Sequence, residues 1–198
     1  MELDEVIRRR HMVRSFEDRA VPPEVVDAVL AHAVRAPSAG FTQGWAFVVL
    51  QGPPQTDVFW RTTTTPDWRA GTRRAGLLRA PVIVLPLAEQ QAYLDRYGEP
   101  DKQGAGLDRA EAWPVPYWLI DTAFATMLML LSAYDAGLGA AFLGIFRGEA
   151  ELLAALGVPP GYRPIGAVAM GYPALDIPSP SLARGRRQVP EVVHRGRW

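Results

Sequence analysis

Cysteine is absent from this chain and lysine is almost absent, since Lys102 is the only one. Without cysteine, disulfides, thiolate metal sites and cysteine nucleophiles are excluded. Nearly all of the positive charge is therefore arginine, which we interpret as the codon bias of a GC-rich genome. The formal net charge is zero, so the overall charge favours neither nucleic acid nor an acidic membrane as a partner.

Several signatures of functional sites are missing as well. The three histidines, His11, His32 and His194, lack the spacing of metal ligands and have no clustered acidic partners. No Gly-x-Ser-x-Gly nucleophile elbow occurs, and no Gly-x-Gly-x-x-Gly fingerprint supports a Rossmann cofactor site. The sequence therefore offers no support for a metal centre, a hydrolase elbow or a Rossmann-type dinucleotide site.

The composition is that of an ordinary globular protein. With 198 residues, 48% of them hydrophobic and 21% charged, the chain is expected to fold as one domain over residues 1–198 with a substantial core. The N-terminal stretch Met1–Glu5 is acidic and does not resemble an apolar signal segment. A cytoplasmic location is therefore the default expectation.

Hydrophobic periodicity and the placement of Pro and Gly predict alternating helices and strands. Helices are expected at Leu3–Arg10, Pro22–Ala36, Tyr117–Ala136 and Glu149–Leu156. Strands are expected at Trp45–Leu50, Val82–Leu85, Ala140–Leu143 and Ile165–Met170. Residues 52–79 carry no clear signal, and residues 91–116 form a polar excursion that we expect to be partly helical. Alternation of this kind indicates a layered α+β or α/β domain.

The segment Tyr117–Ala136 is the longest apolar stretch, and its length alone would allow a membrane span. Polar residues, among them Asp121, Thr122 and Thr126, interrupt the stretch, which favours a helix buried on nearly all sides of a globular protein. Such a helix needs neighbours on every side, so we expect it at the centre of the fold or at a dimer seam.

Arginine and histidine cluster in the stretch Arg10-His11-Met12-Val13-Arg14, at the end of the first predicted helix. An arginine guanidinium is a planar fork of donors that matches phosphate oxygens, so the cluster suits a phosphate-bearing ligand. Arg10 and Arg14 are four residues apart and would share a helix face if the helix continued through both. The alternative interpretation is a solvated basic helix end, which the helix dipole would favour.

A second stretch, residues 36–44 with the sequence Ala-Pro-Ser-Ala-Gly-Phe-Thr-Gln-Gly, joins the second predicted helix to a predicted strand. It offers backbone amides, the Ser38 hydroxyl and the Gln43 side-chain amide, groups that could line a polar planar ring. Together the two stretches indicate a phosphorylated heterocycle lying across a loop that enters a strand.

Ordered motifs over nearly the whole chain resemble those of the nitroreductase family of FMN-dependent flavoproteins. Residues 10–16, Arg-His-Met-Val-Arg-Ser-Phe, are similar to the family's pattern Arg-Arg/His-Ser-x-Arg/Lys-x-Phe, and residues 36–45 are similar to its Ala-Pro-Ser-x-x-Asn-x-Gln-Pro-Trp. Further similar segments are Gly-Leu-Gly at 137–139, Phe-Leu-Gly-Ile-Phe at 142–146, Leu-Gly-Val-Pro at 156–159, Met-Gly-Tyr-Pro at 170–173 and the tail from 184 to 198. Each motif alone carries little weight, but the ordered set is fairly specific.

The resemblance implies an α+β fold in which a mixed sheet is flanked by helices. It also implies an intertwined homodimer with two FMN sites at the interface, each built from both chains. Residues 174–198 would then be a C-terminal extension that packs on the partner subunit. The long apolar helix and the basic tail are consistent with this arrangement.

The resemblance further implies which residues bind the cofactor. Those for the phosphate, the ribityl chain and the ring edge are Arg10, His11, Met12 and Arg14. The tail arginines that would complete the phosphate grip are Arg184 and Arg186. Those bordering the ring are Pro37, Ser38, Ala39, Gln43, Leu143, Gly144 and Ile145. Arg73 and Arg74 stand about where some relatives place another ring contact, although a surface charge pair is the alternative interpretation.

Three departures from the family's patterns fall in this same site. Met12 stands in place of the usual Ser and removes a hydroxyl that often meets the phosphate or the ribityl chain. Phe41 replaces the usual Asn, and Gly44 replaces the usual Pro. Arg14 remains as a positive charge for the pyrimidine edge, where it would favour the anionic reduced flavin and raise the reduction potential.

The implied function is an FMN-dependent oxidoreductase with a ping-pong mechanism. NADPH or NADH would deliver hydride to flavin N5, and a small-molecule acceptor such as a nitroaromatic or a quinone would then take two electrons. No residue is assigned as a proton donor, since position and electrostatics would dominate. Two alternatives stay open: a flavin-dependent oxidase or dehydrogenase of a biosynthetic intermediate, and a non-catalytic flavin-binding dimer.

Overall fold

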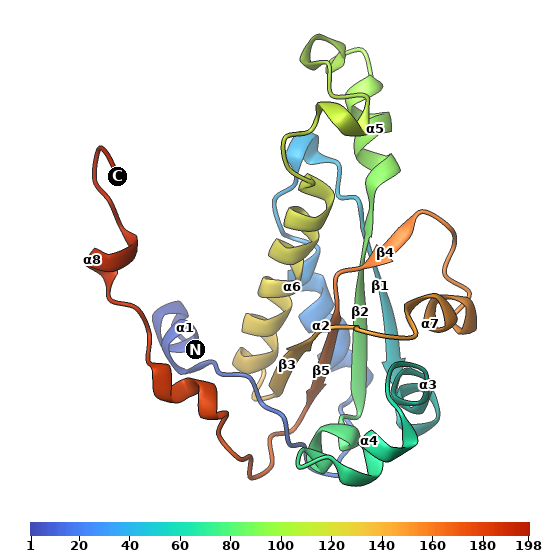
Figure 1. Ribbon diagram of the computed structural model, residues 1–198, viewed down its shortest axis with the longest axis vertical. Coiled ribbons are helices and arrows are strands. Elements are labelled where there is room, and N and C mark those ends of the chain that lie inside the picture. Colours follow the sequence, from blue (N-terminus) through green and yellow to red (C-terminus); the bar gives the residue numbers. More distant parts are fainter.

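A five-stranded sheet forms the centre of the computed structural model, which describes all of residues 1–198 (Figure 1). The strands are β1 (Trp45–Gln51), β2 (Val82–Glu89), β3 (Gly139–Leu143), β4 (Tyr162–Pro164) and β5 (Ala167–Gly171). Their order is β1-β2-β5-β3, with β4 paired to β2, and every strand pair is antiparallel. The parallel component of the expected mixed sheet is a single bridge between Met12 and Ala140.

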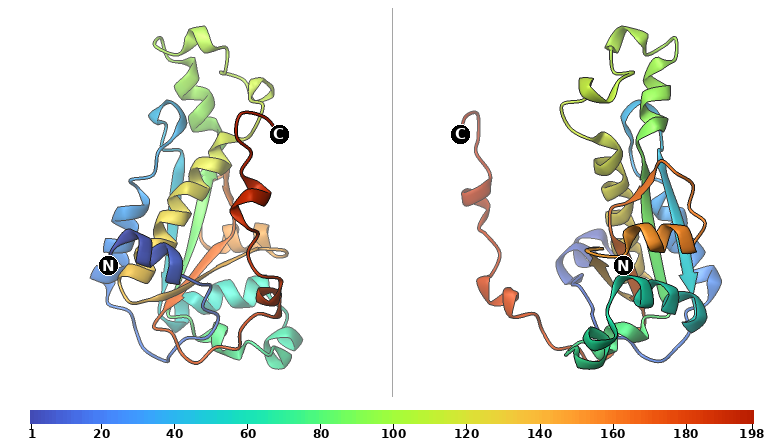
Figure 2. Two further views of the ribbon diagram at one scale, coloured as in Figure 1. Left: turned by 90° about the vertical axis from the view of Figure 1, so that its left-hand side faces the viewer. Right: turned by 45° about the vertical axis from the view of Figure 1, so that its right-hand side comes forward.

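Helices cover both faces of this sheet (Figures 1 and 2). They are α1 (Leu3–Arg9), α2 (Pro23–Ala33), α3 (Pro53–Thr63), α4 (Pro66–Gly71), α5 (Gln90–Gly98), α6 (Tyr117–Asp135), α7 (Glu149–Ala155) and α8 (Val189–Val192). Helices α2 and α6 pack on one face, while α3 and α7 pack on the other. This arrangement confirms the α+β fold class with helices on the two sides of a sheet.

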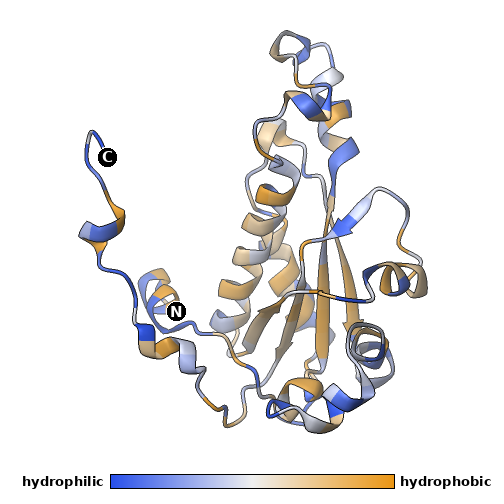
Figure 3. Ribbon diagram, viewed as in Figure 1, coloured by the Kyte–Doolittle hydropathy of each residue, from blue (hydrophilic) through white to orange (hydrophobic).

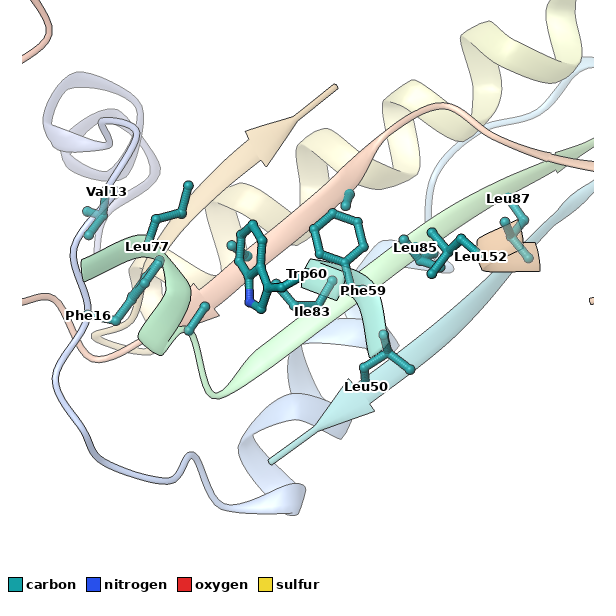
Figure 4. Packing of buried hydrophobic residues seen from close by; sticks show 13 residues of the cluster. Val13, Phe16, Leu50, Phe59, Trp60, Leu77, Ile83, Leu85, Leu87 and Leu152 are labelled. Atoms are coloured by element: carbon teal, nitrogen blue, oxygen red, sulfur yellow. The ribbon is translucent and has the colours of Figure 1, made fainter. Parts of the chain in front are cut away.

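The core lies on the two sides of β2, whose residues are all buried except the last. Side chains alternate between the faces of a strand, so Val82 and Val84 pack with α2 and α6. Ile83 and Leu85 point the other way and pack with α3 and α7, as Figure 4 shows. Burial of each such side chain contributes roughly 1.5–3 kcal/mol, and burial on both faces explains why β2 reads as a continuous apolar run.

Helix α6 is the one helix whose length and hydropathy would allow a membrane span, a property that it shares with core helices of globular proteins. Its buried side packs on α2 and on the sheet through residues such as Ala125, Met129 and Ala133. Burial on nearly all sides was expected, but Phe124 and Met127 lie exposed in the single chain. This side of α6 carries an exposed apolar stripe, because no other element of the chain covers it.

The segments without a clear sequence signal contain short helices. Residues 52–79 form α3, α4 and a 3₁₀ turn, and the polar excursion begins with α5 and continues through two further 3₁₀ turns. The tail beyond residue 174 leaves the body as an extended arm (Figures 1 and 2). Its apolar side chains, for example Leu175 and Trp198, are almost fully exposed, and Figure 3 shows apolar and polar stretches alternating along the arm.

Candidate cofactor-binding site

The arginine cluster lies on an extended segment. Helix α1 ends at Arg9, and Arg10 already has non-helical backbone angles, so a helix does not carry Arg10 and Arg14 on one face. The segment instead pairs with the edge of the sheet: Met12 bridges to Ala140, and the Val13 N–H donates to the Ala140 carbonyl at 3.0 Å. In an extended chain every second side chain points the same way. Arg10 and Arg14 therefore lie on one side of the segment although no helix carries them both.

A cavity of about 440 Å³ opens beside this segment. Its N-terminal wall consists of Arg10, His11, Met12 and Arg14. Its other wall is the beginning of the tail, from Asp176 to Arg186. The structure thus brings Arg186 to the predicted cluster, whereas Arg184 is exposed on the same tail and does not line the cavity.

The guanidinium groups that line this cavity have no acidic partner within the chain. Nη1 of Arg10 is buried and has no hydrogen-bond acceptor, and a buried donor without a partner costs about 1–3 kcal/mol. Arg10, Arg14 and Arg186 form no ion pair with a carboxylate. The carboxylate of Asp176 accepts the backbone N–H of Arg14 at 2.7 Å and fastens the tail to the segment. A phosphate would satisfy the orphaned donor, so the residues present fit a phosphorylated cofactor.

The loop of residues 36–44 has an unusual backbone. Gly40, Phe41 and Gln43 have φ of 62°, 57° and 54°, and such a conformation costs of order 1–3 kcal/mol in a residue other than Gly. Phe41 is 76% exposed. Strained residues of this kind persist only where their surroundings hold them, and they gather at functional sites.

Hydrogen bonds within the loop and from α6 hold that backbone. The Gln43 N–H donates to the Ser38 hydroxyl oxygen at 2.9 Å, and the Ala39 N–H donates to the carboxylate of Asp121 at 2.8 Å. The Ala39 carbonyl accepts from the Thr42 hydroxyl at 2.6 Å. The N–H and the carbonyl of Ala39 are thus both hydrogen-bonded within the protein, so only its side chain is left to contact a ring. The N–H groups of Ser38 and Gly40, by contrast, take part in no hydrogen bond of the chain.

A second cavity, of about 520 Å³, is lined by Leu143, the last residue of β3, and by Gly144, which follows it. Aromatic side chains dominate its walls, namely Phe59, Trp60, Trp68, Phe142 and Phe146. A Cβ at Gly144 would lie 2.6 Å from the end of the Phe146 ring, which is exposed and free to move aside. Ile145 packs against the core and does not line the cavity. Sequence reasoning did not single out Trp68, because it lies in a segment without apolar periodicity.

The two arginines that precede β2 differ in burial. Arg73 is exposed, whereas Arg74 is half-buried and its Nη1 is buried without an acceptor. Arg74 is therefore, with Arg10, one of two arginines that have a buried donor without an acceptor. This environment differs from that of a surface charge pair.

One chain does not bring the arginine cluster and the loop of residues 36–44 together. The loop is hydrogen-bonded to Asp121, near the start of α6. The cluster pairs with Ala140, just beyond Asp135, where α6 ends. The rise of 1.5 Å per residue separates Asp121 from Asp135 by about 21 Å. Figure 1 shows the loop near α5 at one end of α6 and α1 toward the other end.

Comparison with known proteins identifies the family. A sequence model of the nitroreductase family matches residues 7–172 of the chain. A candidate NADH dehydrogenase/NAD(P)H nitroreductase of Archaeoglobus fulgidus is 26% identical over 196 residues, which cover 98% of this chain and 97% of that protein. The chain belongs to the nitroreductase family, and the resemblance in its motifs is confirmed.

Solved structures share the fold. A candidate nitroreductase of Desulfovibrio desulfuricans, solved in complex with FMN, is 27% identical with a TM-score of 0.71, and the match covers 100% of this chain and 98% of that one. A nitroreductase family protein of Clostridium difficile has a TM-score of 0.73 at 21% identity, with both chains covered in full. The architecture is therefore that of the family over the whole chain.

Proposed function

We propose that the protein is an FMN-dependent oxidoreductase that oxidises NADPH or NADH and reduces a small-molecule acceptor. The observation that carries this proposal is the buried, unpaired Nη1 of Arg10, a residue that lines one cavity together with Arg14 and Arg186. A phosphate-bearing cofactor meets that demand, and the related Desulfovibrio protein was solved with FMN. Membership of the nitroreductase family and the names of the relatives supply the reaction class.

The chain's own residues would bind and orient the cofactor. Arg10, Arg14 and Arg186 would neutralise the phosphate, and charge-assisted hydrogen bonds of this kind are about twice as strong as neutral ones. The free N–H groups of Ser38 and Gly40 could donate to the polar edge of the ring. When bound, FMN supplies the two-electron hydride chemistry.

A homodimer would complete the site. The arginine cluster of one chain would face the loop of residues 36–44 of a second chain, since one chain holds these two parts at opposite ends of α6. The exposed Phe124 and Met127 on α6, together with Leu175 and Ile177 on the tail, support such an interface. Residues 174–198 would pack on the partner, and a cytoplasmic location remains a prediction.

The decisive experiment is a visible spectrum of the FMN-reconstituted protein before and after anaerobic addition of NADPH or NADH. Bleaching of the flavin bands would support the reductase. Retained bands that stay oxidised would contradict it in favour of an oxidase or a non-catalytic flavin protein. Failure to retain any flavin would overturn the proposed cofactor.

Arg14→Ala is the matching variant. We expect weaker FMN binding with an intact fold, because a charged donor of the phosphate site is lost. Arg8→Ala is the control, since Arg8 is exposed on α1 and pairs with Asp4 outside the cavity. Equal FMN affinity of the Arg14 variant and the wild type would remove the central assignment.

A further inference from the structure

Helix α6 carries a buried carboxylate that no cation neutralises. Asp121 is 2% exposed and forms no ion pair. One of its oxygens, Oδ2, accepts two hydrogen bonds, from the Ala39 N–H and from the Tyr93 hydroxyl, each at 2.8 Å. A buried charge is costly unless it is well hydrogen-bonded, and both of these bonds lead to the loop of residues 36–44 or to the helix that covers it.

Tyr93 on α5 is the second member of this arrangement. It is fully buried, and burial together with the hydrogen bond to Asp121 raises the pKa of its hydroxyl, so it acts as a donor. Its ring lies against Gly44, where a Cβ would come within 2.5 Å of Cε2. Tyr93 thereby accounts for Gly44 at a position where the family's pattern has Pro.

Two more residues of α5 hold the same loop. Nε of Arg96 donates to the Gly40 carbonyl at 2.9 Å. The ring of Tyr97 lies where a Cβ of Gly40 would come within 2.9 Å. Together with Asp121 and Tyr93, these residues form a clamp from α5 and α6, and the clamp explains how the positive φ angles of the loop are maintained.

We propose that Asp121 is a positioning residue for the cofactor. This inference rests on the proposed function. Through its two hydrogen bonds Asp121 fixes the loop so that the free N–H groups of Ser38 and Gly40 keep a constant place. The Asp121 carboxylate accepts the Ala39 N–H and so places a negative charge close to the loop. This charge disfavours a second negative charge on a reduced flavin ring beside the loop.

Three variants separate the two effects. Asp121→Asn can keep both hydrogen bonds through one oxygen but removes the charge. Asp121→Leu removes the charge and both bonds, and Tyr93→Phe removes one bond. Thr126→Val is the matched control, because Thr126 is equally buried on α6 and its hydroxyl bonds only to the Thr122 carbonyl within the helix.

The measurements are the Kd of oxidised FMN by fluorescence titration and the two-electron midpoint potential by dye equilibration. For Asp121→Asn we expect a Kd within about threefold of wild type and a preference for reduced FMN raised about tenfold, which is about 30 mV toward positive potential. For Asp121→Leu we expect the Kd to rise about tenfold or more, and for Tyr93→Phe severalfold. Thr126→Val should leave both quantities unchanged.

The outcomes distinguish this inference from the function on which it rests. If the wild type binds FMN and is reduced by NAD(P)H, but the potential of Asp121→Asn and the Kd of Tyr93→Phe stay at wild-type values, the positioning role is wrong. If Thr126→Val shows the same losses, Asp121 acts only through general stability and the inference also fails. If the wild type itself neither binds FMN nor is reduced, the proposed function fails instead. Should Asp121→Leu not fold, the other two substitutions still decide.

Discussion

At the scale of single residues, Arg10 is expected to lower the stability of the cofactor-free protein and to strengthen cofactor binding. Its Nη1 lacks an acceptor in a buried position, and such a group is retained where a ligand satisfies it. Binding sites often carry such local destabilisation, so that stability and function are in conflict at the same atom.

Arg10→Met should therefore have effects of opposite sign. Without cofactor, we expect the free energy of unfolding to rise by about 1 kcal/mol, because an unsatisfied donor is removed from a buried position. FMN affinity should fall about tenfold to a hundredfold, as for loss of a charged hydrogen-bond donor. Urea unfolding of the apoprotein and an FMN titration test both parts, and a less stable apoprotein would contradict the first.

Gly44 offers a second test at this scale. Gly44→Ala places a Cβ 2.5 Å from the Tyr93 ring, and overpacking of this kind costs about 1–3 kcal/mol. The cost should shrink when Tyr93→Leu is present, since the two residues are in contact and their effects are not additive. Additive changes in urea unfolding of the two single variants and the double variant would show that Tyr93 does not dictate glycine here.

At the scale of elements, the sequence predicts best where a continuous apolar run meets the buried centre of the fold. The helix at 117–136 and the strand at 82–85 are found because each is a long apolar run bounded by turn residues, and each packs in the core. Strand β4 has only three residues, which is too short for a periodic signal. Helices α3 and α4 lie in a Thr-, Pro- and Arg-rich stretch, where proline at the first turns was the remaining cue.

In the candidate site, the sequence motifs were visible, but the contacts between residues far apart in the chain were not. The motif residues of the arginine cluster were visible in the sequence, but the end of α1 at Arg9 follows from pairing between Met12 and Ala140, far apart in the chain. The clamp was not predictable, because Asp121 meets Ala39 across 82 positions. Such contacts depend on how α5 and α6 are placed, which no local pattern records.

The end of α5 leads to a prediction on pH. Asp101 accepts two hydrogen bonds from Arg96, at 2.7 and 2.8 Å, and this pairing lowers the pKa of the Asp101 carboxyl below its ordinary value of 3.8. A carboxyl with a lowered native pKa stabilises the fold above the unfolded pKa, and this stability is lost as the pH falls through the native value. The benefit should therefore be complete near neutral pH and disappear below about pH 4.

Asp101→Asn tests this expectation. The variant should unfold at lower urea concentration than the wild type at pH 7, and the difference should narrow as the pH is lowered below about 4. Glu151→Gln is the control, since Glu151 is exposed and forms no ion pair. A difference that stays constant from pH 7 to pH 3 would contradict a contribution from the ionised carboxyl.

At the scale of the whole molecule, the exposed stripe on α6 should bury itself between two chains. Phe124 and Met127 lie on the side of α6 that no other element covers. Exposed apolar surface of this kind marks interaction sites. Under the proposed dimer, a second copy of the chain would bring the arginine cluster and the loop of residues 36–44 together, since one chain holds them at opposite ends of α6.

Met127→Glu should weaken both assembly and FMN binding, because burial of a carboxylate in an apolar interface is unfavourable. Size-exclusion chromatography with light scattering, combined with FMN titration, measures the two properties. Glu151→Lys on α7, on the opposite face of the sheet, should leave both unchanged. A Met127→Glu variant that is monomeric and still binds FMN as tightly as the wild type would show that one chain suffices for the site.

The placement of the loop and the arginine cluster at opposite ends of α6 also has a genetic consequence. Under the proposed dimer, an allele with Arg14→Ala and an allele with a damaged loop, such as Ser38→Pro, would each impair both sites of its own dimer. Co-expressed in one cell, they would complement each other, because every mixed dimer contains one site with an intact cluster from one chain and an intact loop from the other. Random pairing would restore about a quarter of all sites.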